Sequence, residues 1–257
     1  MRMLGTRVAI AICAAPAVLA AQSLAQRVSA SEGVAQIIYP SRPGACGDGR
    51  SFIGHVFSHS MSGGGVDDFG ARTQRPCVPG PVRLEVTVLD GEVTRLRPHV
   101  GPVPREATDG RTIEAAASDA VAWLGGLVAD GTGRAANDAI LPLVLAAAPD
   151  PWPLLLRVAR DGNRPHSVRT GALFWIGNRI IDRLGLDDRG ADTPDDEMRS
   201  QAIFVLSQRP RSEGIPELVD IARQNRHAAA RRAAIFWLGQ SGDPRAVDVF
   251  AELLGAR

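Results

Sequence analysis

The chain has no lysine: all 29 of its basic residues, in a length of 257, are arginines. This absence excludes Schiff-base chemistry, a lysine general base and a phosphate-binding P-loop, since each needs an ammonium group. Aromatic residues are also few, at 5% of the chain, with Tyr39 as the single tyrosine. The 28 acidic residues leave a formal net charge of only +1, which argues against a protein that binds nucleic acid or a bilayer by charge.

Long hydrophobic runs are missing after the first part of the chain. Residues 1–26 combine two early arginines with the apolar segment Val8–Ala21 and small residues after it, a pattern typical of a secretory signal peptide. The triplets Val18–Ala20 and Ser23–Ala25 are candidate cleavage sites. No later run is long enough to span a membrane. We therefore expect an exported protein, periplasmic or extracellular, with no membrane span in its mature chain.

Two cysteines remain after this leader, Cys46 and Cys77. An even number in an oxidising compartment favours one disulfide over the alternative of two free thiols. The segment between them includes three consecutive glycines, Gly63–Gly65, and gives no sign that residues 55–76 are ordered. Closing this loop would stabilise the fold by about 3–4 kcal/mol, because it restricts the unfolded chain.

Residues 27–105 have the composition of a small β-rich subdomain stapled by that disulfide. Val34–Tyr39 is one short β-rich run. The segment Pro81–Val100 begins with apolar residues that alternate with polar ones, as in a strand with one buried face. Asp90 and Gly91 follow, and this pair favours the tight turn of a hairpin.

From Thr112 to the end, residues 112–257, the sequence predicts helices that repeat. Segments beginning at Val168, Met198 and Ala230 superimpose without gaps, 30 and 32 residues apart, and a less regular copy begins at Ala116. Each has apolar residues at i, i+4, i+7 and i+8, which is one face of an α-helix. The predicted buried faces are Val168, Ala172, Trp175 and Ile176; Met198, Ala202, Val205 and Leu206; Ala230, Ala234, Trp237 and Leu238; and Ala116, Ala120, Trp123 and Leu124.

Each unit also has a second helix. Asp150-Pro151 and Asp243-Pro244 place a capping carboxylate before a proline, which is a signal for the start of a helix. The unit is a helix–turn–helix of about thirty residues that buries its apolar face only against neighbouring copies. The expected fold is mainly α: an α-solenoid of helix pairs with the β-rich subdomain before it.

The repeats resemble HEAT repeats of the short bacterial type. The match rests on the pattern valine–arginine, alanine, leucine–glycine and glycine–aspartate–proline, and its strongest copy is Arg231–Gly255. The middle copy departs from it, with Ser207 in place of the glycine. The whole chain also resembles exported bacterial HEAT-repeat proteins with a Cys-Gly-Asp/Asn-Gly-Arg segment, here Cys46–Arg50. The resemblance implies a protein-binding surface and no reaction.

Two more positions recur in the three clear copies, a phenylalanine at i+6 and an arginine at i+1. The phenylalanines lie nearly opposite the predicted buried face, so they either fill the gap to an adjacent helix or form an exposed ladder that binds a partner. Packing is favoured, because exposed aromatic rows are rare on soluble proteins. For the arginines, pairing with nearby carboxylates is favoured over ligand binding. The residues are Phe174, Phe204 and Phe236, and Arg169, Arg199 and Arg231.

No motif for catalysis, metal binding or cofactor binding is specific. His55 and His59 are spaced i, i+4, but the glutamate that an HEXXH zinc site needs is absent. Gly131–Ala136 matches a loose dinucleotide fingerprint, yet it follows a helical segment and is interpreted as a turn. The acidic segment Leu186–Glu197 lacks calcium-loop spacing, and its last acids favour the start of the next helix.

We therefore predict a non-catalytic exported scaffold, without cofactor or metal, that binds another protein through its HEAT-repeat surface. The alternative is an enzyme or metal-binding protein with a site at the junction between the β-rich subdomain and the solenoid. That site would use histidines and aspartates near the junction, namely His55, His59, His99 and Asp67 or Asp68.

Overall fold

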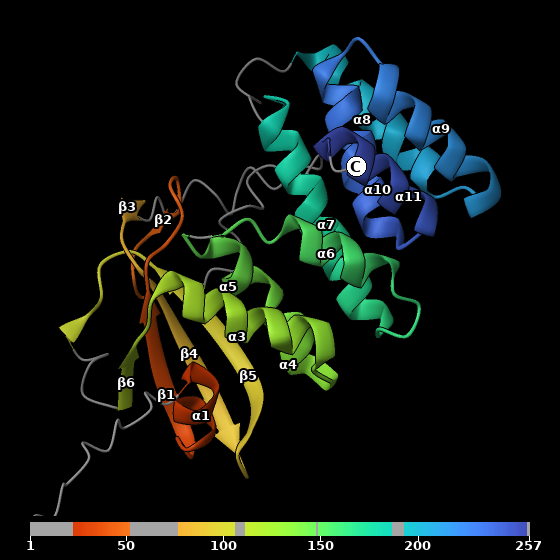
Figure 1. Ribbon diagram of the computed structural model, residues 1–257. Helices are drawn as coiled ribbons and strands as arrows, with labels where there is room; N and C mark the ends of the chain where they lie inside the picture. Colours follow the sequence, from red (N-terminus) through yellow and green to blue (C-terminus); the bar gives the residue numbers. More distant parts are fainter. Residues whose placement is uncertain (1–22, 52–76, 106–110, 148, 187–192, 256–257) are drawn as a thin grey trace, which may run out of the picture.

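A computed structural model describes residues 23–51, 77–105, 111–147, 149–186 and 193–255. The described chain is mainly helical, with a four-stranded sheet and a two-stranded one in its N-terminal part (Figure 1). The four-stranded sheet and the helices share one continuous hydrophobic core. Along the chain the helices after the sheet are α3 (Ala117–Asp130), α4 (Gly133–Asp138), α5 (Ile140–Leu145), α6 (Trp152–Arg160), α7 (His166–Arg183), α8 (Pro194–Ser207), α9 (Arg211–Gln224), α10 (Ala228–Ser241) and α11 (Pro244–Leu254).

The sheet contains four strands in the order β5-β4-β1-β6. Strands β4 (Val82–Leu89) and β5 (Glu92–Val100) form the expected hairpin, and both turn residues, Asp90 and Gly91, have positive φ. Strand β1 (Gly33–Tyr39) is antiparallel to β4 and parallel to β6 (Arg111–Glu114). The sequence predicted helix from Thr112, but residues 111–114 are a strand because they extend the sheet beside β1.

A short helix precedes the sheet. Helix α1 (Leu24–Ser29) begins with a capping box, in which Ser23 and Gln26 each accept a hydrogen bond from the other's main-chain N–H. Leu24 and Val28 of this helix are buried in the core. The helix therefore starts inside the segment 1–26 that was predicted as a leader.

The two cysteines are bonded to each other in the structure. Strands β2 (Cys46–Gly47) and β3 (Val78–Pro79) pair antiparallel, and the Cα atoms of Cys46 and Cys77 are 4.9 Å apart. The bond joins two segments that are 31 residues apart in sequence. It therefore closes the loop for which a disulfide was expected.

Helices α3, α4 and α5 connect the sheet to the repeats. The hydroxyl of Tyr39, at the end of β1, donates a buried hydrogen bond of 2.9 Å to the carbonyl of Pro142 in α5. The chain after β1 then bridges to the end of α5, through Ser41 and Ala146. One bond of this bridge is donated by Arg42 N–H to the carbonyl of Leu145 at 2.8 Å. The side-chain hydrogen bond and the bridge together fix the start of the helical part against the sheet.

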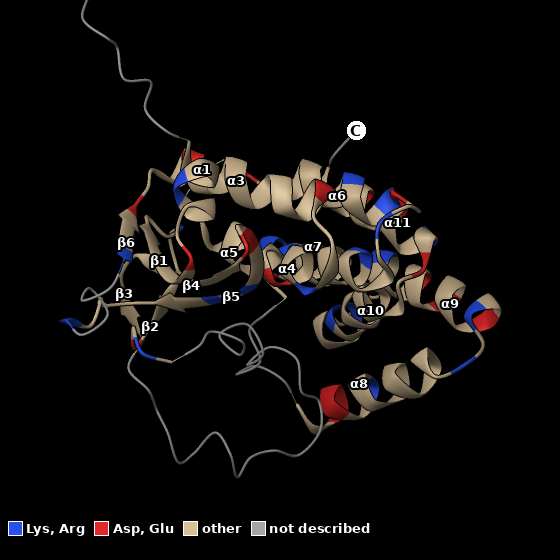
Figure 2. Ribbon diagram, turned by 90° about the horizontal axis from the view of Figure 1, so that it is seen from below, with Lys and Arg blue, Asp and Glu red and all other residues tan. Residues whose placement is uncertain are grey.

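The repeat helices do not stack in sequence order. Helix α10 packs against both α7 and α8 and lies between them (Figure 2), and α11 contacts both α6 and α9. The pair α10/α11 thus lies between α6/α7 and α8/α9, although in the sequence α8/α9 follows α6/α7 directly and precedes α10/α11. A solenoid of tandem repeats would stack its units consecutively, so this order differs from the expected one.

Helices α7 and α10, the two best-matching copies, run antiparallel. Gly239 of α10 lies against Leu173 of α7, where a Cβ atom would be 3.3 Å from the Leu173 carbonyl oxygen. Reciprocally, a Cβ atom on Gly177 of α7 would lie 3.5 Å from the carbonyl oxygen of Ile235. These two glycines occupy the glycine position of the repeat pattern, so that position allows the two backbones to approach closely.

The predicted buried faces hold in α7 and α10 but not in α8. In α7 and α10 the i, i+4 and i+8 residues are buried and the tryptophans are half-buried. In α8, Met198 is 71% exposed, Val205 is 65% exposed and Ala202 is exposed too, so the prediction is wrong for these three residues. The fourth, Leu206, is half-buried against the core. Its buried side chain is Ile203. The reason is the stacking order. The three helix pairs form a row in the order α6/α7, α10/α11, α8/α9, so α8 lies at the end of this row and packs on α9 and α10 with a different side.

Candidate functional site

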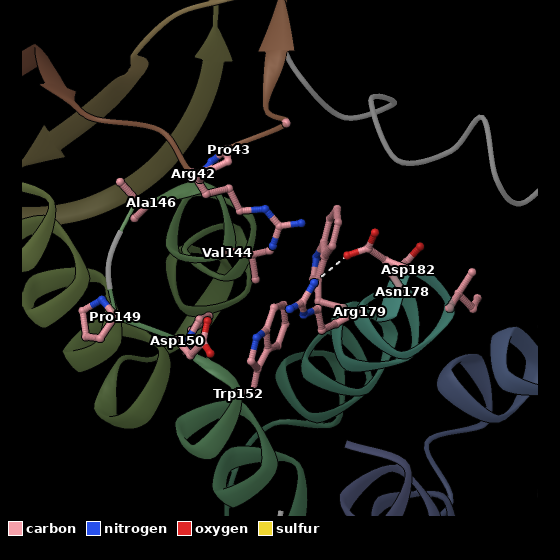
Figure 3. A pocket seen from close by; sticks show the side chains of 15 residues that line it. Arg42, Pro43, Val144, Ala146, Pro149, Asp150, Trp152, Asn178, Arg179 and Asp182 are labelled. Atoms are coloured by element: carbon pink, nitrogen blue, oxygen red, sulfur yellow. Dashed lines mark hydrogen bonds and ion pairs between the residues drawn. The ribbon is translucent and has the colours of Figure 1, made fainter. Parts of the chain in front are cut away.

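A cavity of about 690 Å³ lies at the junction between the sheet and the repeat helices. Its walls come from the connection after β1, from the connection between α5 and α6, and from one side of α7 (Figure 3). The volume is within the range typical of small-molecule sites. The described lining includes no histidine, so the cavity differs from the junction site that the sequence suggested. The lining residues are Arg42, Pro43, Gly44, Val144, Ala146, Ala147, Pro149, Asp150, Pro151, Trp152, Trp175, Asn178, Arg179, Ile181 and Asp182.

Two arginines from different elements meet in this cavity. Arg42 comes from the connection after β1 and Arg179 from α7, and their side chains extend towards each other (Figure 3). Arg179 donates a hydrogen bond of 2.6 Å to Asp182, one turn further along α7. Burial lowers the pKa of Arg42 and the positive charge of Arg179 lowers it further, while Asp182 and Asp150 act in the opposite direction.

Aromatic rings form part of the same wall. The guanidinium of Arg179 lies over the ring of Trp152, 6.0 Å from its centroid, which is a cation–π distance. Trp152 is only 8% exposed, and Trp175 is half-buried. Trp152 and Asp182 therefore hold Arg179 in one orientation from two directions.

Asp150 has a different role from the one predicted. It was expected to cap α6, but the N-cap position is Pro151 and no side chain caps this helix. The Asp150 side chain lines the cavity instead (Figure 3). By contrast, Asp243 caps α11 as predicted, because its carboxylate accepts from the N–H of Arg245 at 2.9 Å.

The three repeated phenylalanines belong to one continuous aromatic cluster. The rings of Phe174 and Phe236 meet edge to face with their centroids 6.4 Å apart. Phe204 is 40% exposed and its ring lies 5.1 Å from Trp237, whose ring is 4.8 Å from Phe236. Trp175, 5.1 Å from Phe174, lines the cavity. The cluster thus runs from the cavity across α7 and α10 to α8.

The three repeated arginines do not form one surface. Arg199 pairs with Asp196, at 2.7 Å, in the first turn of its own helix. Arg231 donates to the main-chain carbonyl of Ala222 at 3.3 Å. Because α7 and α10 run antiparallel, Arg169 and Arg231 lie near opposite ends of the pair.

The sheet contains a buried arginine–histidine pair that no sequence pattern indicated. Arg83 and His99 face each other on β4 and β5, and both are buried. Arg83 donates to the carbonyl of Gly49 at 3.0 Å, and Nδ1 of His99 lies 3.0 Å from the carbonyl oxygen of Arg50. Burial and the charge of Arg83 lower the pKa of His99. The Cys46–Arg50 segment is therefore anchored to the sheet by its main-chain carbonyls.

The other candidates for a junction site are two histidines and two aspartates. His55, His59, Asp67 and Asp68 lie outside the described residues. Within the described ranges, no three His, Cys, Asp or Glu side chains are close enough to hold a metal ion. None of the described helices has the length and hydropathy to cross a membrane.

Comparison with known proteins places the C-terminal part of the chain. Residues 189–257 match the family model of HEAT repeats. Neither a curated protein nor a solved structure matches the chain. HEAT repeats generally mediate binding between proteins and are typically not catalytic. Residues 189–257 are therefore similar to HEAT repeats, the family that the repeated helices resemble in sequence.

Proposed function

We propose that this is an exported, non-catalytic interaction protein that binds another protein through the exposed side of α8. The observation that carries the proposal is the exposure of the apolar residues Met198 and Val205 on a helix of the HEAT-repeat match. They are spaced i, i+7, with Ala202 between them, and so share one face of the helix. Large apolar residues gathered on one exposed face mark a protein-interaction surface.

The position of α8 in the row also supports this proposal. The face at the end of a stack of repeats is the one to which a further helix can be added. Phe204, next to this face, already contacts Trp237 of α10. The proposed surface is therefore the edge of the row, in place of the concave inner face of a regular solenoid.

Two features support the proposed export. The first 26 residues have the composition of a secretory leader, and the two later cysteines are paired, which an oxidising compartment favours. We propose that the mature protein is periplasmic or extracellular.

Site-specific photo-crosslinking in the native cells tests the surface. A benzoylphenylalanine residue at position 198 or 205 should give a discrete cross-linked protein, and the same residue at Asp220, an exposed position of α9, should not. In a chain that carries the crosslinker at the exposed position Ala202 instead, Met198→Ser with Val205→Ser should remove the cross-linked partner while the free energy of unfolding changes by less than about 1 kcal/mol. Equal products from all three positions, or none, would contradict the proposal.

A further inference from the structure

The junction cavity brings two positive charges together in a partly buried place. The side chains of Arg42 and Arg179 extend towards each other (Figure 3), and two neighbouring guanidinium groups offer several N–H donors to an anion in the cavity. Arg179 is held from the side by Asp182 and by the ring of Trp152. Its orientation is therefore set before any ligand arrives.

The net charge of the lining limits the kind of anion. Among the described residues of the lining, Arg42 and Arg179 are balanced by Asp150 and Asp182, so their formal charges sum to zero. A single negative charge can be placed between the two guanidinium groups at modest cost. A second one would meet the two carboxylates at the wall.

The remaining lining provides apolar contact area. Trp152 and Trp175 present indole rings, and Val144 and Ile181 add aliphatic side chains. A guanidinium group binds a carboxylate through two parallel hydrogen bonds, and an indole ring packs well against an apolar or aromatic group. Small-molecule sites typically combine such an apolar wall with a few placed polar groups.

From this arrangement we propose that the cavity binds a monoanionic ligand with a carboxylate and an adjoining apolar group. The carboxylate lies between Arg42 and Arg179, and the apolar group packs against Trp152 and Trp175. The source is either a small organic acid or the C-terminal residue of a polypeptide, which have this chemistry in common. The site is separate from the exposed side of α8, so the inference stands independently of the proposed function.

The backbone around the cavity is tied together without a ligand. The N–H of Arg42 donates to the carbonyl of Leu145, and the N–H of Ala147 donates to the carbonyl of Pro40 at 3.0 Å. These bonds hold the connection after β1 against the end of α5. A site whose walls are preformed loses little entropy on binding.

Two probes that differ only in charge test the inference. N-acetyl-L-phenylalanine carries the carboxylate, and N-acetyl-L-phenylalaninamide replaces it with a neutral amide. Calorimetry or tryptophan fluorescence on the full chain should show at least about tenfold tighter binding of the acid. Equal affinity for the two probes, or no binding of the acid at about 10 mM, would overturn the inference.

Variants show whether the binding occurs in this cavity. Arg42→Gln and Arg179→Gln should each weaken binding of the acid about tenfold or more and leave the amide unaffected. Arg160→Gln is the matched control, because Arg160 pairs with Asp248 on the outside of α6 and does not line the cavity. A similar loss in all three variants would overturn the site. Melting temperatures of the free proteins identify any variant that fails to fold.

A peptide arm distinguishes the two sources. An octapeptide that ends in phenylalanine is measured with a free and with an amidated C terminus. Tighter binding of the free peptide than of N-acetyl-L-phenylalanine indicates a polypeptide ligand, and weaker binding indicates a small acid. A dianionic probe, phenyl phosphate, tests the charge of the ligand. It should bind more weakly than the carboxylate, because its second negative charge would meet the two aspartates of the lining. Tighter binding would overturn the assignment of a monoanion.

Discussion

The ring of Phe174 in α7 meets the ring of Phe236 in α10 edge to face, with their centroids 6.4 Å apart. Both residues occupy the same position of the repeat. They meet because the two helices run antiparallel and side by side, and Gly177 and Gly239 allow the backbones to approach closely. A residue that recurs in the sequence thus pairs with its own counterpart.

The phenylalanine pair should contribute to stability. In a double-mutant cycle with Phe174→Leu and Phe236→Leu, we expect a coupling free energy of about 0.5–1.5 kcal/mol, since an edge-to-face pair adds this much beyond its buried area. Denaturant unfolding measures it. The cycle of Phe174→Leu with Phe204→Leu is the control, because the Phe204 ring packs on Trp237. Equal coupling free energies in the two cycles would contradict a specific contribution from the Phe174–Phe236 contact.

The glycine of the repeat should be required for helix packing. Gly239→Ala should destabilise the fold by about 1–3 kcal/mol, because the new methyl group would press on the Leu173 backbone. Gly126→Ala, inside α3 and with open space around it, should instead stabilise by about 0.5–1 kcal/mol through helix propensity. Thermal or urea unfolding of the two variants checks this, and a shift in the same direction for both would refute it.

His99 should make stability depend on pH. Burial and Arg83 lower its pKa, although the Arg50 and Ser51 main chain and Glu85 oppose the shift. The unfolded chain therefore binds a proton at a higher pH than the folded one, so stability is complete above the ordinary histidine pKa and falls as pH drops below it. Urea unfolding at several pH values between about 7 and 5 measures the slope.

The matching controls are two substitutions. His99→Gln should flatten this part of the pH profile, while His166→Gln, at an exposed position, should leave it unchanged. An unchanged slope in His99→Gln would show that another group is responsible.

The capping box of α1 distinguishes the two candidate cleavage sites. A chain that begins at Ala21 keeps Ser23 and Leu24, whereas a chain that begins at Gln26 loses the cap and a buried side chain. The shorter chain should be less stable by about 2–4 kcal/mol, as measured by denaturant unfolding. We expect the mature protein to begin at Ala21, which N-terminal sequencing checks. Equal stability of the two chains would remove the structural reason for this choice.

Local features of the fold could be predicted from the sequence. The hairpin follows from strict alternation and the Asp90-Gly91 turn, and the cap of α11 follows from Asp243-Pro244. Strand β6 could not be predicted, because four residues carry too little periodicity and their conformation depends on β1. The stacking order of the repeats could not be predicted either, since similar apolar faces can pair in any order.

In the candidate site too, residues that belong to a local or repeated pattern could be predicted, and residues brought together from distant segments could not. Residues near a repeat position, such as Phe174 and Phe236, were found because they recur. The cavity was not found, because Arg42, Trp152 and Arg179 come from three elements and share no motif. Asp150 resembled a helix cap in sequence, and only the position of Pro151 at the start of α6 shows otherwise.

The antiparallel pairing of α7 with α10 also determines when, during synthesis, the core around α7 can be completed. Helix α7 is complete at Arg183, but the helix that covers Leu173 and Gly177 ends at Ser241. At ordinary translation rates the ribosome needs roughly 3–12 s to reach that residue. During this interval one side of α7 has no native partner from α10, and α8 and α9 emerge before the pair that will be inserted between them and α7. The last thirty residues of the chain are therefore the ones that close its core.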